Sequence, residues 1–414
     1  MTTISPFSRP FYMMAKPAGS TCNLACTYCY YLEKSELYDR LPHVMSDEVL
    51  ERFISEYIAC QPATEILFTW HGGEPLVRPL SFYQRVIRLQ RKYAAGKHID
   101  NAIQTNGTLL NDEWCRFFRD NGWLVGVSID GPEPLHNAYR TTRGGVGTFH
   151  EVMAGIERLN RHRVEWNALA CVNHLTAAEP LAVYHFFRDT GCRYIQFTPV
   201  VERLLRHDGR TPADDHRQRL LAADETAGAE LAPFSVTPTA WGQFLCTVFD
   251  EWVKRDVAEI YVNVFDATLA NWLGVTPGMC SLSHLCGHVG SVEWNGDIYP
   301  CDHFTFAHHR LGNLMQQPLY SLMNGARQQA FARQKTDGLP RQCRDCEFLF
   351  ACHGECPRNR FATSTDGTPG LNYLCEGYRQ FFRHMAPAMT FMADEYRAGR
   401  PPANVMKRNV NYKL

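Results

Sequence analysis

The sequence predicts an α/β protein that begins with a partial (β/α)6 barrel and continues into a smaller cysteine-rich domain and a C-terminal helix. Short apolar runs alternate with amphipathic stretches over the first half of the chain, which is typical of successive β/α units. Cysteines are dense in the second half, and an amphipathic stretch follows them. Of the 414 residues, 45% are hydrophobic, which is enough for a sizeable core.

Six apolar runs are expected to form the parallel strands of the barrel, with helices between them. Asn111 is placed to cap a helix that ends before Gly122, and Thr148 with Glu151 forms a capping box ahead of Val152. In such barrels the functional sites lie at the carboxyl ends of the strands. The strands are expected at residues 12–15, 66–69, 102–104, 124–129, 168–172 and 194–197.

The pattern changes after the sixth run and divides the rest of the chain. Residues 204–230 are charged and rich in alanine, which indicates an excursion or a linker helix, whereas residues 238–255 have an apolar stripe that predicts a strong helix. A terminal helix is expected at residues 378–396. We therefore expect a barrel domain over residues 1–235, linker helices over 236–276, a cysteine-rich domain over 277–383, and a C-terminal helix and tail over 384–414.

Charge and cysteine usage limit the class of function. The 42 basic and 43 acidic residues are spread along the chain, so no nucleic-acid partner is expected. Residues 1–10 lack the apolar core of a signal peptide, and no apolar run has the length of about 18 residues that a membrane span needs. We expect a cytoplasmic protein without a membrane partner. In that reducing compartment, 16 cysteines indicate metal ligation, and iron–sulfur clusters indicate an anaerobic setting.

Cys22, Cys26 and Cys29 form a Cys-x3-Cys-x2-Cys loop after the first expected strand. Three thiolates at this spacing can hold three corners of a [4Fe–4S] cluster and leave one iron open. A structural zinc site needs four ligands, which this loop does not supply. A zinc-binding cysteine loop remains the alternative.

This loop, closed by an aromatic residue, resembles the signature of the radical S-adenosylmethionine (SAM) enzymes. The resemblance implies that SAM binds the open iron and is cleaved to methionine and a 5′-deoxyadenosyl radical. Gly72, Gly73 and Glu74 follow the second expected strand and resemble the GGE motif of the family, whose backbone receives the methionyl amine of SAM. The further SAM contacts that the resemblance implies are Tyr28, Ser128 and Arg140.

Eight more cysteines lie between residues 280 and 375, which is enough for two complete four-cysteine sites. Their spacing resembles the SPASM domain, an auxiliary-cluster domain of peptide-modifying radical SAM enzymes. Two structural zinc sites are the alternative. The resemblance implies two auxiliary [4Fe–4S] clusters for electron transfer or scaffolding, and three clusters in all. One ligand set would be Cys280, Cys286, Cys301 and Cys356, and the other Cys343, Cys346, Cys352 and Cys375.

Asp302 follows Cys301 in a Tyr-Pro-Cys-Asp string that resembles the anaerobic sulfatase-maturating enzymes, in which this aspartate is the general base. An aspartate that caps a surface turn is the alternative. The resemblance implies oxidation of a cysteine or serine, in a Cys/Ser-x-Pro-x-Arg motif of an unfolded sulfatase, to Cα-formylglycine. The radical would take hydrogen from the substrate Cβ, and the second electron would leave to the auxiliary cluster that includes Cys301. A flavodoxin or ferredoxin is the expected reductant.

Two other functions stay open. The first is another SPASM-type enzyme that forms thioether or carbon–carbon crosslinks in peptides. Such enzymes often have an N-terminal precursor-binding wing, for which Cys22 lies too near the N-terminus. The second is an iron–sulfur or zinc scaffold or electron-transfer protein, which leaves the open three-cysteine loop and the GGE motif unexplained. One mechanism would serve cysteine and serine substrates alike.

Overall fold

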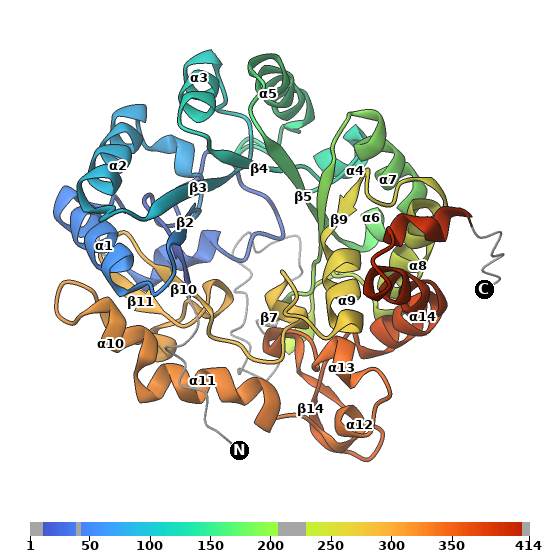
Figure 1. Ribbon diagram of the computed structural model, residues 1–414. Helices are drawn as coiled ribbons and strands as arrows, with labels where there is room; N and C mark the ends of the chain where they lie inside the picture. Colours follow the sequence, from blue (N-terminus) through green and yellow to red (C-terminus); the bar gives the residue numbers. More distant parts are fainter. Residues whose placement is uncertain (1–10, 39–42, 206–228, 408–414) are drawn as a thin grey trace. The chain divides into compact units, whose positions relative to one another are not determined.

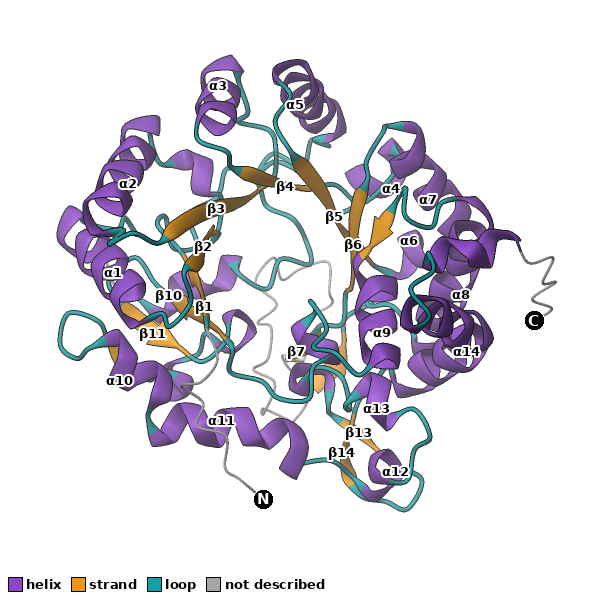
Figure 2. Cartoon of the chain, in the orientation of Figure 1, coloured by secondary structure: helices purple, strands orange, loops and turns teal. Residues whose placement is uncertain are grey.

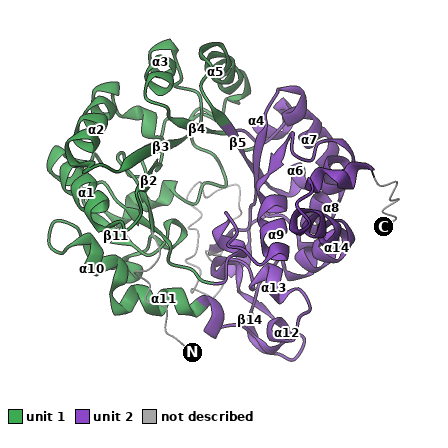
Figure 3. Cartoon of the chain, in the orientation of Figure 1, with its two compact units in different colours: residues 1–128, 137–166, 285–334 green, residues 129–136, 167–284, 335–414 purple. Residues whose placement is uncertain are grey.

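The computed structural model describes residues 11–38, 43–205 and 229–407, and these form two compact units (Figure 3). Unit 1 comprises residues 1–128, 137–166 and 285–334, and unit 2 comprises residues 129–136, 167–284 and 335–414. Each unit therefore combines segments that are far apart in the sequence. Three of the expectations fall on residues outside the described ranges. These are the absence of a signal peptide at residues 1–10, most of the excursion or linker helix expected over 204–230, and the end of the tail.

The core of unit 1 is a sheet in which an N-terminal strand and a strand from the cysteine-rich region are neighbours (Figure 1). The strand order is β12-β11-β10-β1-β2-β3-β4. Strands β10 to β4 in this order run parallel, and β11 and β12 are antiparallel additions. The strands are β1 (Tyr12–Ala15), β2 (Glu65–Trp70), β3 (His98–Thr105), β4 (Leu124–Ser128), β10 (Val289–Val292), β11 (Asp297–Tyr299) and β12 (Gly312–Asn313).

Helices α1, α2, α3 and α5 cover the strands of unit 1 (Figure 2), because each buries one apolar stripe. As predicted, the side chain of Asn111 caps α3 by accepting a hydrogen bond from the N–H of Trp114 at 3.0 Å. Trp70, Tyr83 and Trp123 form a buried aromatic core with ring centroids 5.7–6.4 Å apart. The helices are α1 (Asp47–Cys60), α2 (Leu80–Tyr93), α3 (Asp112–Asp120), α5 (Phe149–His162), α10 (Leu319–Asn324) and α11 (Ala326–Asp337).

The predicted capping box at the start of α5 is wrong, although the helix begins where it was expected. Thr148 makes no capping hydrogen bond, and its hydroxyl donates to the carbonyl of Arg140 at 3.1 Å. Instead, the side-chain oxygen of Asn137 accepts from the N–H of Phe149 at 3.0 Å. A side chain from outside the helix therefore replaces the local cap.

Unit 2 combines the parallel strands β5, β6 and β9 with a layer of helices. Helix α8 has the predicted bounds and buries Trp241 and Trp252. Helix α14 packs along α8 at two glycines, because a Cβ on Gly377 would lie 2.1 Å from the carbonyl oxygen of Pro238, and one on Gly242 only 2.8 Å from Gly377. The elements are β5 (Trp166–Val172), β6 (Tyr194–Pro199), β9 (Tyr261–Val262), α4 (Glu133–Asn137), α6 (His174–Ala178), α7 (Pro180–Asp189), α8 (Pro238–Arg255), α9 (Asn263–Leu273), α12 (Arg341–Arg344), α13 (Leu349–Cys352), β13 (Ala362–Thr363), β14 (Pro369–Leu371) and α14 (Cys375–Arg397).

The six predicted strands are confirmed as β1 to β6, and the predicted terminal helix is confirmed within α14. Of the two alternatives expected for residues 204–230, an excursion or a linker helix, the helix is wrong at both described ends. There β7 (Arg203–Leu205) and β8 (Ala229–Leu231) pair as a short antiparallel ladder. Among the described residues, no helix combines the length and the apolar character that a membrane crossing requires.

Candidate active site

The predicted three-cysteine loop follows β1 in unit 1, and main-chain hydrogen bonds fix its shape. The N–H of Cys29 donates to the carbonyl of Cys26 at 3.1 Å. The N–H of Ala25 donates to the carbonyl of Thr141 at 2.9 Å. Cys22, Cys26 and Cys29 are all half-buried. Main-chain hydrogen bonds therefore fix the backbone that carries the three thiols.

The surroundings of the thiols fit an iron–sulfur cluster. The sulfur of Cys22 accepts hydrogen bonds from the N–H of Leu24 at 3.4 Å and from Nδ2 of Asn106 at 3.8 Å. Burial raises the pKa of Cys22 to about 11, with smaller contributions from Glu74 and then Cys26, and burial also raises the pKa of Cys29. These thiols stay protonated at neutral pH until a metal displaces the proton. Donors aimed at sulfur would then stabilise the thiolates.

Gly72 and Gly73 pack so closely against the start of the loop that no side chain would fit. The N–H of Gly73 donates to the carbonyl of Gly19 at 2.7 Å. A Cβ on Gly73 would lie 2.2 Å from the carbonyl oxygen of Thr21, and Gly72 has a φ of +132°. The glycines therefore bring the motif backbone beside the cysteine loop, as a backbone site for the methionyl amine requires.

The carboxylate of Glu74 is fully buried and joins the ends of β2 and β3. One oxygen accepts from the hydroxyl of Thr105 at 2.8 Å and from the N–H of Leu76 at 2.9 Å, and the other accepts from the N–H of Asn106 at 2.7 Å. Burial raises the pKa of Glu74 to about 7, although these donors oppose the shift. Glu74 thus positions Asn106, whose amide faces Cys22.

Glu74→Gln should destabilise unit 1. The amide of glutamine would turn an NH₂ group toward one of the three donors and leave a buried donor unpaired, which costs about 1–3 kcal/mol. Urea unfolding of the reduced protein should show this loss of free energy of unfolding. Glu113→Gln, on the exposed first turn of α3, is the matched control and should unfold like the wild type. Equal stability of both variants would contradict the role given to Glu74.

The same carboxylate predicts a pH dependence of stability. Its pKa in the folded protein, about 7, lies above its ordinary value of 4.5, so the folded state binds the extra proton between these values. The resulting stabilisation is fully present below pH 4.5 and is lost as the pH rises through about 7. Unfolding measured across this window should show a slope in the wild type that is smaller in Glu74→Gln.

The three predicted SAM contacts lie in unit 1 with the cysteine loop. The hydroxyl of Ser128, at the end of β4, accepts from Nε2 of Gln104 at 3.0 Å. The buried guanidinium of Arg140 lies 5.5 Å from the centroid of the Tyr28 ring, and its charge also acts on the thiol of Cys29. Their contacts with SAM stay predictions.

Three residues that the sequence pattern did not single out lie at neighbouring strand ends in unit 1. Lys16, His71 and Glu293 directly follow β1, β2 and β10, and β1 pairs in register with both other strands. The three side chains therefore start at the same level of the sheet. A signal was available, because a titratable residue directly after a buried apolar strand of such a fold marks its functional edge.

Asp302 is buried, at 5% exposure, and forms an ion pair with Lys16. It also accepts a hydrogen bond from the hydroxyl of Tyr30. Burial would raise the pKa of Asp302, but opposing effects, led by the positive charge of Lys16, outweigh it and hold the pKa well below its ordinary value. The carboxylate is therefore ionised at neutral pH. The alternative of a surface turn cap is wrong, because the side chain is enclosed.

His71 is held as a neutral imidazole. Its Nδ1 accepts from the N–H of Gly72 at 2.8 Å and lies 3.2 Å from Nζ of Lys16. Burial, followed by the charge of Lys16, lowers the pKa of His71 to about 4. The two donors at Nδ1 assign the ring proton to Nε2.

A second buried acid shares the charge of Lys16. Glu293 accepts a hydrogen bond from the hydroxyl of Tyr31, and Nζ of Lys16 lies 4.4 Å from the centroid of that ring. Burial raises the pKa of Glu293 to about 7, against the opposing effects of Tyr31 and Lys16. The buried ammonium group of Lys16 therefore interacts electrostatically with two carboxyl groups, those of Asp302 and Glu293.

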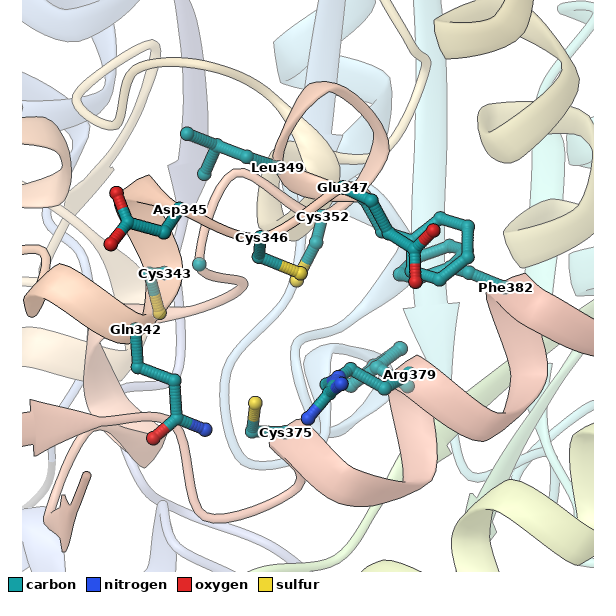
Figure 4. Close-up of a pocket in the computed structure, with 13 residues that line it drawn as sticks. Gln342, Cys343, Asp345, Cys346, Glu347, Leu349, Cys352, Cys375, Arg379 and Phe382 are labelled. Atoms are coloured by element: carbon teal, nitrogen blue, oxygen red, sulfur yellow. The ribbon is translucent and has the colours of Figure 1, made fainter. Parts of the chain in front are cut away.

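Four predicted cluster ligands line one cavity of about 370 Å³ in unit 2 (Figure 4). The thiols of Cys343, Cys346 and Cys375 point toward this space, and Cys352 completes the set. Within the part of the chain that the structure describes, no three His, Cys, Asp or Glu side chains meet as ligands of a single ion do. A [4Fe–4S] cluster instead spreads its thiolates over four irons. The cavity fits the auxiliary cluster that the resemblance implies.

The ligands of the other predicted auxiliary cluster belong to both units. Cys286 and Cys301 lie in unit 1, and Cys280 and Cys356 lie in unit 2. This ligand set stays a prediction.

Two family models match the chain. The model described as "Radical SAM superfamily" matches residues 17–187, which include the three-cysteine loop. The model described as "SPASM: Iron-sulfur cluster-binding domain" matches residues 286–347.

Several curated proteins are similar to this chain over nearly its whole length. A serine-type anaerobic sulfatase-maturating enzyme of Bacteroides thetaiotaomicron is 56% identical over 98% of this chain and 97% of its own. A serine-type enzyme of Klebsiella aerogenes is 37% identical, over 93% of this chain and 88% of its own. A cysteine-type enzyme of Clostridium novyi is 30% identical, over 92% and 96%.

A solved structure agrees with these relatives. Native anSMEcpe with bound AdoMet and the Cp18Cys peptide is 29% identical, with a TM-score of 0.81 over 94% of this chain and all of that one.

The parallel sheet, the three-cysteine loop and the cysteine-lined cavity define a radical SAM enzyme with an iron–sulfur SPASM domain. SAM, its [4Fe–4S] cluster and auxiliary iron–sulfur clusters are the cofactors of this class. The 56% identity over nearly all of both chains narrows the class, and the chain belongs to the anaerobic sulfatase-maturating enzymes. The predicted fold and enzyme class are confirmed, and the scaffold and crosslinking alternatives are not supported.

Proposed function

We propose that this enzyme oxidises a serine or cysteine side chain, in the Cys/Ser-x-Pro-x-Arg motif of an unfolded sulfatase, to Cα-formylglycine. The observation that carries this proposal is the buried, ionised carboxylate of Asp302, one residue after the predicted ligand Cys301. The enzyme's family membership supports the substrate class, and a solved relative holds a peptide together with AdoMet.

The residues of unit 1 fit the cofactor pair. Cys22, Cys26 and Cys29 would hold the SAM-binding cluster, and the backbone of Gly72 and Gly73 would hold the methionyl end of SAM. When bound, this pair supplies a 5′-deoxyadenosyl radical, which takes one hydrogen atom from the substrate Cβ.

Asp302 then has the role of proton acceptor. Lys16 keeps its carboxylate ionised, so it can take the proton of the substrate hydroxyl or thiol. Loss of that proton and of a second electron completes a two-electron oxidation of the side chain. Serine gives the aldehyde directly, whereas cysteine gives a thioaldehyde that water hydrolyses with release of hydrogen sulfide. The cysteines of the predicted auxiliary sites would hold iron–sulfur clusters, which would supply an electron acceptor for this oxidation.

We propose that serine is the preferred substrate residue. Relatives at 56% and 37% identity are named serine-type, and a relative at 30% is named cysteine-type. The chemistry at Asp302 is the same for both residues, so the preference is expected in rate and not in outcome.

Matched peptides test this function. Reconstituted enzyme, SAM and dithionite are incubated anaerobically with peptides that carry serine, cysteine or alanine before x-Pro-x-Arg. Mass spectrometry should find aldehyde and 5′-deoxyadenosine with the serine and cysteine peptides, faster with serine, and no aldehyde with alanine. If fully iron-loaded enzyme forms 5′-deoxyadenosine but oxidises neither peptide, the substrate class is wrong.

We also propose a flavodoxin or ferredoxin as electron donor and the cytoplasm as the site of the reaction. None of the 16 cysteines forms a disulfide, which is the state that a reducing compartment maintains. Replacing dithionite by a reduced flavodoxin should sustain turnover, and failure with both flavodoxin and ferredoxin would contradict the proposed donor.

A further inference from the structure

A strained turn in unit 2 joins two predicted cluster ligands. Between Cys352, at the end of α13, and Cys356, three consecutive residues have positive φ: His353 at +49°, Gly354 at +71° and Glu355 at +51°. Side chains other than glycine rarely adopt this left-handed region. Such a turn persists only when its surroundings hold it.

The side chain of Arg360 holds this turn. Its Nε donates to the carbonyl of Gly354 at 2.9 Å, and its Nη2 donates to the carbonyls of His353 at 3.0 Å and Glu355 at 3.2 Å. One guanidinium group therefore donates hydrogen bonds to the carbonyls of all three left-handed residues. A Cβ on Gly354 would lie 2.6 Å from Nη2, so the approach of the guanidinium requires glycine there.

Arg360 also reaches a second segment that carries a predicted ligand. Its Nη1 donates to the carbonyl of Lys335 at 2.6 Å. The fully buried Nζ of Lys335 in turn donates to the carbonyls of Cys280 at 2.9 Å and Ser281 at 2.7 Å. The side chains of Arg360 and Lys335 therefore form a chain of hydrogen bonds that connects the left-handed turn with the backbone at Cys280.

The two cations also act through their charge. The guanidinium of Arg360 bonds the main chain between the predicted ligands Cys352 and Cys356, and Nζ of Lys335 bonds the carbonyl of the predicted ligand Cys280, so both charges lie beside ligand-bearing backbone. A positive charge beside an iron–sulfur cluster favours the more negative, reduced state. Each of the two predicted auxiliary ligand sets therefore has one of these cations near a ligand.

We propose that Arg360 is a positioning residue for the auxiliary clusters. It holds the turn that joins a ligand of one cluster to a ligand of the other, and its charge raises the reduction potential of the cluster in the Cys343 cavity. This inference rests on the proposed ligand sets. Arg360 acts through the auxiliary clusters, so its loss should leave SAM cleavage intact and slow peptide oxidation.

Two substitutions separate geometry from charge. Arg360→Gln removes the charge and most of the hydrogen bonds, whereas Arg360→Lys keeps the charge but cannot bond all three carbonyls. Redox titration of the anaerobically reconstituted full chain, followed by EPR, should show a lower auxiliary-cluster potential in Arg360→Gln. Arg360→Lys should keep a potential nearer the wild type but change the EPR line shape. Arg341→Gln, whose side chain is 83% exposed, is the control and should shift neither property.

Wild-type potentials and line shapes in both Arg360 variants would overturn the inference. If Arg360→Gln fails to hold iron, Arg360→Lys decides alone: a changed line shape supports the clamp, and a wild-type line shape refutes it. The ligand set has its own test, because Cys343→Ala should lose the iron of one cluster, and unchanged iron content would overturn the assignment on which the inference rests. None of these readings depends on formylglycine formation, so failure of the proposed function is distinguishable.

Discussion

Asp302→Asn should retain most of the SAM cleavage while formylglycine formation falls by about 10²- to 10⁴-fold. The asparagine amide has nearly the same shape as the carboxylate, but it cannot accept the substrate proton. Oxidation at Cβ then lacks the step that releases the second electron. The two products, 5′-deoxyadenosine and peptide aldehyde, are measured in the same anaerobic incubations, so their ratio reports the defect directly.

Asp297→Asn is the matched control for Asp302→Asn. Asp297 is also a buried acid of unit 1, but its carboxylate accepts from the amides of Asn295 and Asn313 and pairs with Arg310. This substitution should leave the ratio of aldehyde to 5′-deoxyadenosine unchanged. Equal loss of both products in Asp302→Asn would show that Asp302 only supports the structure.

Lys16→Met should be the most destabilising single substitution in unit 1. It removes the fully buried ammonium group and leaves Asp302 as an uncompensated buried charge, at a cost of about 3–5 kcal/mol. The pKa of Asp302 should rise, because Lys16 is the main charge that lowers it. Chemical denaturation of the reduced protein measures the loss, and peptide oxidation should fall with it.

The double variant Lys16→Met/Asp302→Asn tests the cause of that instability. It removes both charges, so it should recover most of the free energy of unfolding while peptide oxidation stays low. Lys92→Met provides the exposed control, because the Lys92–Glu51 pair has side chains that are 59% and 35% exposed and should contribute less than about 1 kcal/mol. A stable Lys16→Met variant would contradict the buried ion pair.

The same ion pair predicts a pH dependence of opposite sign to that of Glu74. The pKa of Asp302 in the folded protein is depressed below its ordinary value of 3.8. Its contribution to stability is therefore present above pH 3.8 and is lost as the pH falls below that value. Lys16→Met should lack this acid-side loss when unfolding is followed on both sides of that pH.

Local sequence patterns predict most of the fold but not the pairing across the chain. The six apolar runs identify β1 to β6, because a buried parallel strand is a continuous apolar stretch. Strand β10 is short, and its partner β1 lies far away in the sequence, so no local pattern indicates their pairing. The cap of α5 could not be predicted locally for the same reason, because Asn137 lies outside the helix and contacts it only in the folded protein.

The candidate site likewise has one part that the sequence predicts and another part that only the fold brings together. The local spacing of Cys22, Cys26 and Cys29 indicates the cysteine loop, and the resemblance to the SPASM domain implies the four cysteines that line the cavity. Lys16, His71 and Glu293 come together only through the register of β1 with β2 and β10. The left-handed turn that Arg360 holds contradicts local preference at His353, and only tertiary contacts explain it.

The measurement that tests the account most directly is the fate of the substrate Cβ hydrogen. A Ser-x-Pro-x-Arg peptide deuterated at the serine Cβ is incubated anaerobically with the reconstituted enzyme, SAM and dithionite. The account predicts 5′-deoxyadenosine that carries one deuterium and a peptide aldehyde that retains the other. Aldehyde formed together with unlabelled 5′-deoxyadenosine would contradict it, because the hydrogen atom would then have left the substrate by another route.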